Sequence, residues 1–114
     1  MGHRLLLILG LVFGWSGPAF ASAAEDVAVF VGHCAACHGP DGRARTPQGR
    51  KIKAKVLRDS RLTDAEIERQ IREGSRVKTG VTVMPAVGKD MTDADIAAAV
   101  RVVVGFRVDQ EKAK

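Results

Sequence analysis

The sequence predicts a single all-α domain, for two reasons. The chain has 114 residues, a length that allows one ordinary domain. Thr63 and Thr92 each stand three residues before an acidic residue, Glu66 and Asp95, and each is followed by a run in which apolar residues recur at helical spacing. This arrangement is typical of helix N-termini closed by a capping box.

The first 23 residues are expected to be a secretory signal peptide that is cleaved off. Arg4 precedes an uninterrupted apolar run over residues 5–13, a Ser-Gly-Pro break ends it, and small residues then offer cleavage sites after Ala21 and after Ala23. A bilayer span needs about 20 apolar residues, so an uncleaved membrane anchor is the less favoured alternative. We therefore expect a periplasmic protein.

The remaining domain, residues 24–114, is small and poor in aromatic side chains. Phe30 and Phe106 are its only aromatic residues, and the whole chain carries a formal net charge of +5. Domains of this size often need a covalent or cofactor-based staple, because their apolar core is small. The composition thus raises the question of what fills the core.

Four helices are expected in this domain. The first covers residues 25–35, and a shorter one covers 51–58 after a loop rich in glycine and proline. The third covers 63–73 and ends at Gly74, a typical helix stop. The last covers 93–108. The tail beyond it, residues 109–114, is expected to fray. The side chains expected to face the core are Val27, Phe30, Val31, Ile52, Val56, Leu57, Ile67, Gln70, Ile71, Ile96, Val100 and either Val103 or Val104.

Residues 34–38 read Cys-Ala-Ala-Cys-His, which is the C-x-x-C-H attachment motif of c-type haem. In that chemistry two thiols add to the two vinyl groups of a porphyrin, and a short helix-like segment between them matches the separation of those groups. The next residue, His38, is then held under the iron and donates a ring nitrogen. The motif predicts that Cys34 and Cys37 bind one haem c covalently and that His38 is an axial ligand.

Three other interpretations of the motif are open. A disulfide or redox dithiol between Cys34 and Cys37 is compatible with export, although no apolar strand precedes the first cysteine, as a thioredoxin-like site requires. A zinc site would have to add His33 and His38 to the two cysteines, within six residues and without a second ligand pair downstream. The third interpretation is coincidence.

Met84 is the predicted second axial ligand of the iron. It lies between two helices, and Pro85 restricts the backbone directly after it. Ordinary loop packing is the alternative role for this methionine. The competing Met91 precedes the cap Thr92 and is expected to pack on the following helix. His33 is expected to be a solvated surface histidine.

These residues together resemble the class I c-type cytochromes, the small monohaem electron carriers of bacterial periplasms, over nearly all of residues 25–107. The resemblance rests on Phe30 four residues before the first cysteine, the glycine after His38, the I-x-x-G sequence at residues 71–74, and the Met-Pro pair at 84 and 85. It implies an all-α fold of three to four helices packed around one covalently attached haem.

The resemblance also implies a proline carbonyl that supports the proximal histidine. Pro47 is the expected position for it, and Pro40 is the second choice. The sequence departs from the family in the last helix, where Val102 stands in place of a usual aromatic and Phe106 comes one turn later.

With His38 and Met84 both bound, the iron has no open position for a substrate. We therefore expect a one-electron carrier, not an enzyme, in a respiratory or photosynthetic-type electron-transfer chain. One alternative is a haem c electron-transfer subunit of an oxidoreductase complex. The other is an open-site haem protein that binds small gases or peroxide, but residues 81–88 lack a His, Arg or Glu to assist peroxide cleavage.

The segment from Arg43 to Arg61 contains eight basic residues and a single acidic one. Such a segment can steer an acidic redox partner, or it can be a solvated face that offsets the haem propionates. Nucleic acid is not expected as a partner, because the protein is expected to be exported and carries no recognised reader motif. We expect a monomer without stable membrane insertion.

Overall fold

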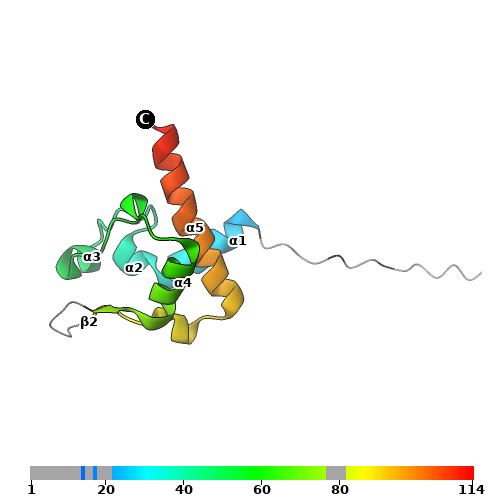
Figure 1. The fold of residues 1–114 in the computed structure, drawn as a ribbon, viewed down its shortest axis with the longest axis horizontal. Helices are drawn as coiled ribbons and strands as arrows, with labels where there is room; N and C mark the ends of the chain where they lie inside the picture. Colours follow the sequence, from blue (N-terminus) through cyan, green and yellow to red (C-terminus); the bar gives the residue numbers. More distant parts are fainter. Residues whose placement is uncertain (1–13, 15–16, 18–21, 77–81) are drawn as a thin grey trace, which may run out of the picture.

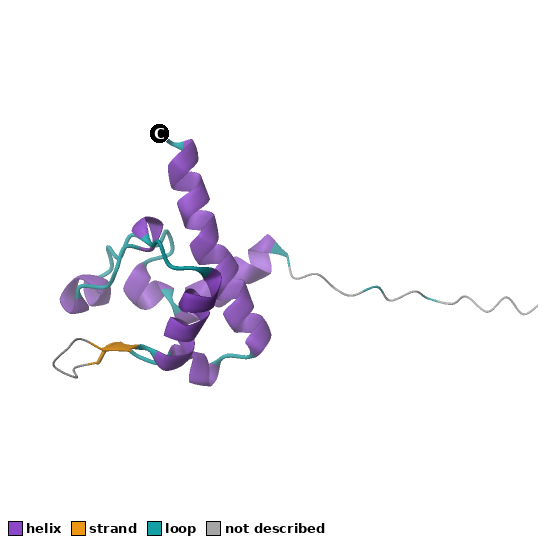
Figure 2. Cartoon of the chain, in the orientation of Figure 1, coloured by secondary structure: helices purple, strands orange, loops and turns teal. Residues whose placement is uncertain are grey.

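The computed structural model describes residues 14, 17, 22–76 and 82–114, and over these residues the fold is helical with one short pair of strands (Figure 1, Figure 2). The prediction of an all-α domain is confirmed, although the antiparallel strand pair was not foreseen. Most of the expected leader lies outside the described residues. In chain order the elements are α1 (Ala23–His33), α2 (Ala35–His38), α3 (Pro47–Ile52), η1 (Leu57–Asp59), α4 (Asp64–Glu73), β1 (Ser75–Arg76), β2 (Thr82–Met84), η2 (Val87–Asp90) and α5 (Asp93–Lys112).

Helix α1 begins directly after Ser22, which caps it. The Ser22 hydroxyl oxygen accepts from the Glu25 amide at 3.2 Å, and the Glu25 carboxylate accepts from the Ser22 amide at 2.7 Å. This reciprocal pair is a capping box, which satisfies two amides that the helix itself cannot bond. The helix ends at His33, earlier than predicted, because the backbone leaves the helical region at Cys34.

The face that α1 turns to the core differs from the prediction. Phe30 is fully buried as expected and Asp26 is only 8% exposed, whereas Val27 and Val31 are each 48% exposed. The prediction that both valines face the core is therefore wrong. Asp26 and Phe30 are four residues apart and so lie on one side of the helix, and their contacts with α5 set its rotation.

An aromatic pair and an ion pair join α1 to α5, which lies across it (Figure 1). The ring centroids of Phe30 and Phe106 are 5.3 Å apart with planes at 76°, an edge-to-face contact. Two nitrogens of Arg101 each donate to the Asp26 carboxylate at 2.7 Å. These hydrogen bonds hold the pKa of Asp26 below its ordinary value, so the pair stays charged at neutral pH. Phe106 therefore supplies the interhelix aromatic contact even though Val102 occupies the usual family position.

Helix α3 lies earlier in the chain than predicted, over Pro47–Ile52 instead of residues 51–58. The Thr46 side chain caps it, and a proline fills its first position, where the missing amide is not needed. Lys53 then adopts a left-handed conformation, with φ of 54°, and ends the helix. Val56 consequently falls outside the helix and is exposed, contrary to the prediction.

The two predicted capping boxes are confirmed. Thr63 and Glu66 exchange hydrogen bonds at the start of α4, and Thr92 and Asp95 do so at the start of α5. Helix α4 stops at Gly74 as predicted, and this residue has a φ of 72°, a region that favours glycine. Residues close to each N-terminus thus determine where the two helices begin.

Helix α5 continues beyond its predicted end near Val108 and reaches Lys112. The prediction that residues 109–114 fray is therefore wrong for most of this tail. Residues 109–112 contain no glycine or proline to break the helix. A lysine at the C-terminal end also interacts favourably with the helix dipole.

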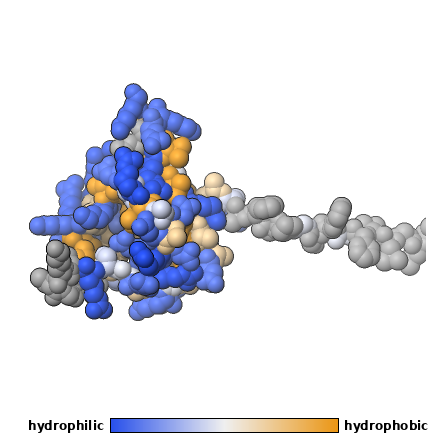
Figure 3. Space-filling view, in the orientation of Figure 1, coloured by the Kyte–Doolittle hydropathy of each residue, from blue (hydrophilic) through white to orange (hydrophobic). Residues whose placement is uncertain are grey.

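The core lies between α1, α4 and α5, and the predicted core faces of α4 and α5 are confirmed. Hydrophilic side chains cover most of the face seen in Figure 3, with apolar side chains visible between them. The buried apolar residues of this core are Phe30, Ala35, Ile67, Ile71, Ile96, Ala99, Val100 and Val103.

Candidate functional site

The C-x-x-C-H residues form a short helical turn of their own. Cys34 lies between α1 and α2 (Ala35–His38), as the C-cap of the first helix and the N-cap of the second. The amides of Cys37 and His38 both donate to the Cys34 carbonyl oxygen, at 3.3 and 3.0 Å. Residues three apart in such a turn lie on the same side of it. The two half-buried thiols are therefore held close together, with the histidine next to the second one.

The pKa of the first thiol differs from that of a redox dithiol. Burial, together with the neighbouring Cys37, raises the pKa of Cys34 to about 11. Redox dithiols instead have a lowered thiol pKa, because the thiolate is the attacking species. The first cysteine also follows a helix, whereas a thioredoxin-like site follows a strand. The structure therefore disfavours the dithiol interpretation.

The zinc interpretation required both cysteines together with His33 and His38. Within residues 22–76 and 82–114, no three or more His, Cys, Asp or Glu side chains are grouped so that they could hold a metal ion. His33 is exposed at the end of α1, as expected for a surface histidine.

One hydrogen bond fixes the imidazole of His38. Its Nδ1 atom lies 3.0 Å from the carbonyl oxygen of Lys55. A carbonyl oxygen only accepts hydrogen bonds, so Nδ1 carries the proton and donates, and the lone pair remains on Nε2. Burial lowers the pKa of His38, although the Lys55 carbonyl opposes the shift. The neutral imidazole with a free Nε2 is the form that binds iron.

The expected support of His38 by Pro47 is wrong. The structure assigns this contact to the carbonyl of Lys55, and Pro47 instead occupies the first position of α3. The left-handed turn at Lys53 ends α3 and directs the chain back toward the histidine. Any residue type offers a backbone carbonyl, so nothing in the sequence distinguishes Lys55 for this role.

Helix α3 packs closely on the C-x-x-C-H turn. The Thr46 hydroxyl donates to the Ala36 carbonyl at 2.7 Å and accepts from the Gly49 amide at 3.0 Å. A Cβ atom on Gly49 would overlap the Cys37 carbonyl oxygen. Sequence analysis missed both residues, although Thr46 followed by Pro47 is a recognisable helix start. Together they hold the cysteine turn against α3.

Met84, the predicted second ligand, ends strand β2 and is paired with Ser75 of β1. Its side chain is half-buried and packs against the same apolar core as Cys34. The backbone there is tightly placed, because a Cβ atom on Gly74 would overlap the Met84 carbonyl oxygen. Met91 also touches this core, from its expected place directly before the cap Thr92.

The donor set fits a c-type haem. It comprises two thiols on one helical turn, a neutral imidazole with a free Nε2, and a thioether on a different element. Cys34, Cys37 and His38 would hold the group, and the apolar core beside Cys34 would receive its hydrophobic ring.

The basic segment from Arg43 to Arg61 is exposed at seven of its eight basic residues. Arg58 is the half-buried one, and its Nε donates to the Asp41 carbonyl at 3.2 Å while its guanidinium lies 5.9 Å from the Phe106 ring centroid. The segment also lines most of a cavity of about 330 Å³, bounded by Arg43, Arg45, Val56, Arg58, Asp59 and Ala113.

Comparison with known families gave one finding. The family model described as cytochrome C oxidase, cbb3-type, subunit III matches residues 21–101. Searches of curated proteins and of solved structures returned no match.

The contact between α2 and α3 predicts an effect of Gly49→Ala on haem attachment. The added methyl group must displace the Cys37 carbonyl oxygen, and we expect a several-fold lower yield of covalently haem-loaded protein in haem-stained denaturing gels. Gly32→Ala is the matched control, because nothing lies within 4 Å of its added methyl group. It should keep the yield and add about 0.5–1 kcal/mol of stability. Equal yields from the two variants would contradict the packing argument.

Proposed function

The chain belongs to the family of cytochrome c oxidase, cbb3-type, subunit III, and from this premise we propose that it carries one electron at a time on a single haem c ligated by His38 and Met84. The family match covers residues 21–101, most of the chain, and implies haem c and an electron-transfer role. A single C-x-x-C-H motif in the sequence supports one haem. The proposed ligand pair and monohaem character are those of the class I cytochromes.

The hydrogen bond from His38 Nδ1 to the Lys55 carbonyl is the observation that carries this proposal. It fixes the ring orientation and tautomer, leaves Nε2 to ligate, and raises the basicity of the ligating nitrogen. Cys34 and Cys37 on the same turn would keep the attached group at a constant position relative to that ring. A site that transfers electrons must change its charge without changing its geometry, and these contacts meet that requirement.

Bound haem supplies one-electron redox chemistry at its iron. The residues of this chain tune and shield that chemistry. With haem bound, a thioether from Met84 would favour the reduced state of the iron and would leave no open position for a substrate. The apolar core beside Cys34 excludes water and works in the same direction. We therefore assign outer-sphere electron transfer and no chemistry on a substrate.

A second candidate function is that of a haem c subunit within an oxidase complex, which the family match favours. The two candidates use the same site and differ in assembly. Gel filtration of the native protein separates them, because a free carrier elutes as a monomer and a subunit elutes with a larger haem-containing complex.

We also propose that the chain is exported to the periplasm and loses its leader. As a separate observation, none of the helices within residues 22–76 and 82–114 combines the length and the apolar character of a membrane span. Of the two small-residue cleavage sites, the one after Ala21 keeps Ser22, whereas the one after Ala23 removes it. Ser22 forms the capping box of α1 with Glu25, and losing such a cap costs about 1 kcal/mol. The fold therefore favours cleavage after Ala21.

The expected N-terminus of the exported protein is accordingly Ser22. Intact-mass measurement of periplasmic protein should give the mass of residues 22–114 plus one haem. A chain that starts at Ala24 should unfold at a lower denaturant concentration than one that starts at Ser22, because it lacks the cap. An uncleaved chain, or a mature protein that begins at Ala24, would refute this assignment.

The basic segment from Arg43 to Arg61 is proposed as the face that meets an acidic redox partner. It includes Lys55, whose carbonyl contacts the proximal histidine, so this face lies next to the redox site. A field of one sign speeds the encounter with an oppositely charged partner, and salt screens it.

Small oxidants of opposite charge test this face. Oxidation by the ferricyanide anion should slow as salt is added, and Lys51→Gln with Lys53→Gln should weaken that salt dependence. Arg69→Gln removes a charge on α4, outside the basic segment, and is the control that should leave the salt dependence unchanged. Oxidation by a cationic cobalt(III) complex should show the opposite salt response. Identical salt responses for both oxidants would rule out the basic face as the entry point.

Met84→Ala tests the proposed ligand pair. Thioether-ligated ferric haem has a weak far-red absorption band, and this variant should lose the band, bind carbon monoxide when reduced, and show a lower reduction potential. Met91→Leu is the matched control and should retain the band and the potential. Loss of the band in Met91→Leu, with its retention in Met84→Ala, would reverse the assignment.

A further inference from the structure

We propose that Arg72 is a positioning residue for Met84, because it joins the end of α4, on which the Met84 backbone rests, to the start of α5. The inference rests on the proposed ligation of iron by Met84. It concerns residues 82–92, which carry Met84 and lead into α5. We call them the Met84 segment.

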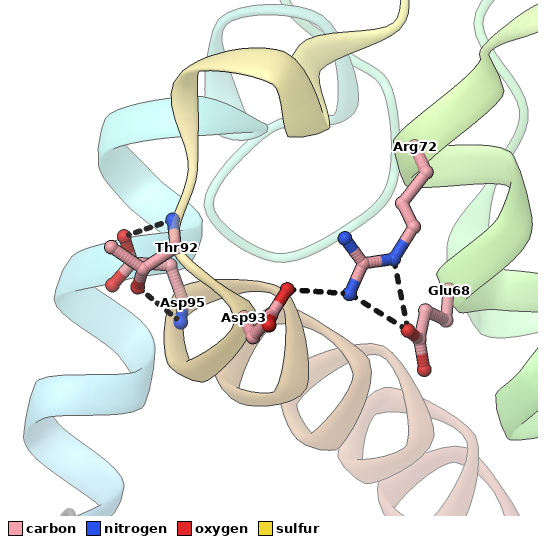
Figure 4. A network of polar contacts seen from close by, with 5 residues as sticks. All are labelled: Glu68, Arg72, Thr92, Asp93 and Asp95. Carbon is pink, nitrogen blue, oxygen red and sulfur yellow. Dashed lines mark hydrogen bonds and ion pairs between the residues drawn. The ribbon is translucent and has the colours of Figure 1, made fainter.

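Arg72 lies in the last turn of α4 and bonds in two directions (Figure 4). Its Nε donates to Glu68 one turn earlier in the same helix, at 2.9 Å, and its Nη2 donates to Asp93 in the first turn of α5, at 2.8 Å. The contact to Glu68 orients the guanidinium, and the contact to Asp93 joins the two helices. The bridge therefore holds the C-terminal end of the Met84 segment against α4.

The start of α5 is itself well defined at this point. Thr92 and Asp95 exchange backbone-to-side-chain hydrogen bonds of 3.1 Å on either side of Asp93 (Figure 4). This capping box fixes where the helix begins, and it therefore fixes the backbone position of Asp93, whose carboxylate Arg72 meets.

Two glycines let the Met84 segment lie directly on the last turn of α4. A Cβ atom on Gly88 would come within 3.0 Å of both the Arg72 Cα atom and the Ile71 carbonyl oxygen. A Cβ atom on Gly74 would overlap the Met84 carbonyl oxygen. The backbone at Met84 is thus held against the end of the helix that bears Arg72. Movement of α4 relative to the start of α5 is therefore transmitted to the methionine.

The bridge is weak as a contribution to global stability. The Arg72 side chain is 41% exposed and that of Asp93 is 90% exposed, and pairs of this kind contribute about 0–1 kcal/mol. Breaking it should therefore leave the folded protein intact while the Met84 segment opens more often. This difference separates a positioning role from a general structural one.

The test uses the haem-loaded protein and measures how readily Met84 leaves the iron. Carbon monoxide can bind the reduced protein only when the methionine dissociates, so the binding rate reports segment opening. We expect Arg72→Gln and Asp93→Asn each to raise this rate by about two- to five-fold, the range that an exposed ion pair allows. The denaturation midpoint should change little in either variant.

Two further variants serve as rescue and control. Arg72→Lys keeps a cation that can reach Asp93 and should restore most of the wild-type rate. Arg69→Gln is matched in helix and chemistry, but the electrostatic partner of Arg69 is Glu66 within α4, so its rate should stay at the wild-type value. The double variant Arg72→Gln with Asp93→Asn should bind carbon monoxide no faster than either single variant, because both remove the same contact.

The outcomes distinguish this inference from the proposed function. If the wild-type protein shows the far-red thioether band while Arg72→Gln and Asp93→Asn bind carbon monoxide at the wild-type rate, Arg72 has no positioning role and the ligand assignment stands. A wild-type protein without the band would overturn the ligand assignment and, with it, the role of Arg72. An equal acceleration in Arg69→Gln would reduce the effect to general loss of charge.

Discussion

Two thiols and an imidazole share one helical turn, and many of the contacts around them follow from this constraint. The turn cannot simply continue α1, because the backbone leaves the helical region at Cys34 and α2 restarts after it. A separate turn of four residues has little stability of its own. It depends on α3, whose cap Thr46 reaches the Ala36 carbonyl, and on Lys55, whose carbonyl accepts from His38.

The rest of the domain provides a frame for this turn. Helices α1 and α5 are joined by an aromatic contact and an ion pair, and these decide which side of α1 faces inward. Phe106 also contacts a second segment. A Cβ atom added to Gly42 would lie only 2.7 Å from a carbon of the Phe106 ring. The loop after the cysteine turn is thereby tied to the last helix. A small domain with only two aromatic residues concentrates its packing on these few contacts.

Met84 and His38 are held in place by different kinds of contact. His38 is held by a hydrogen bond to its own ring, whereas Met84 is placed through its backbone, by strand pairing with Ser75 and by the close approach of Gly74. A thioether is a poor hydrogen-bond acceptor, so apolar packing and the chain that carries Met84 must orient it. Of the two proposed ligands, His38 is therefore the more rigidly held, and the position of Met84 depends on the backbone contacts of its segment.

Local sequence patterns determined the helix starts at Thr63 and Thr92, the helix stop at Gly74 and the C-x-x-C-H motif, because each depends on residues within a few positions of one another. The rotation of α1 and the support of His38 could be known only from the tertiary structure. Val27 and Val31 match a helical core pattern as well as Phe30 does, but Asp26 meets Arg101 from the opposite end of the chain and turns the valines outward. The Lys55 carbonyl likewise has no residue-type signature. Both features arise from contacts between distant segments, and such contacts form only when the chain is folded.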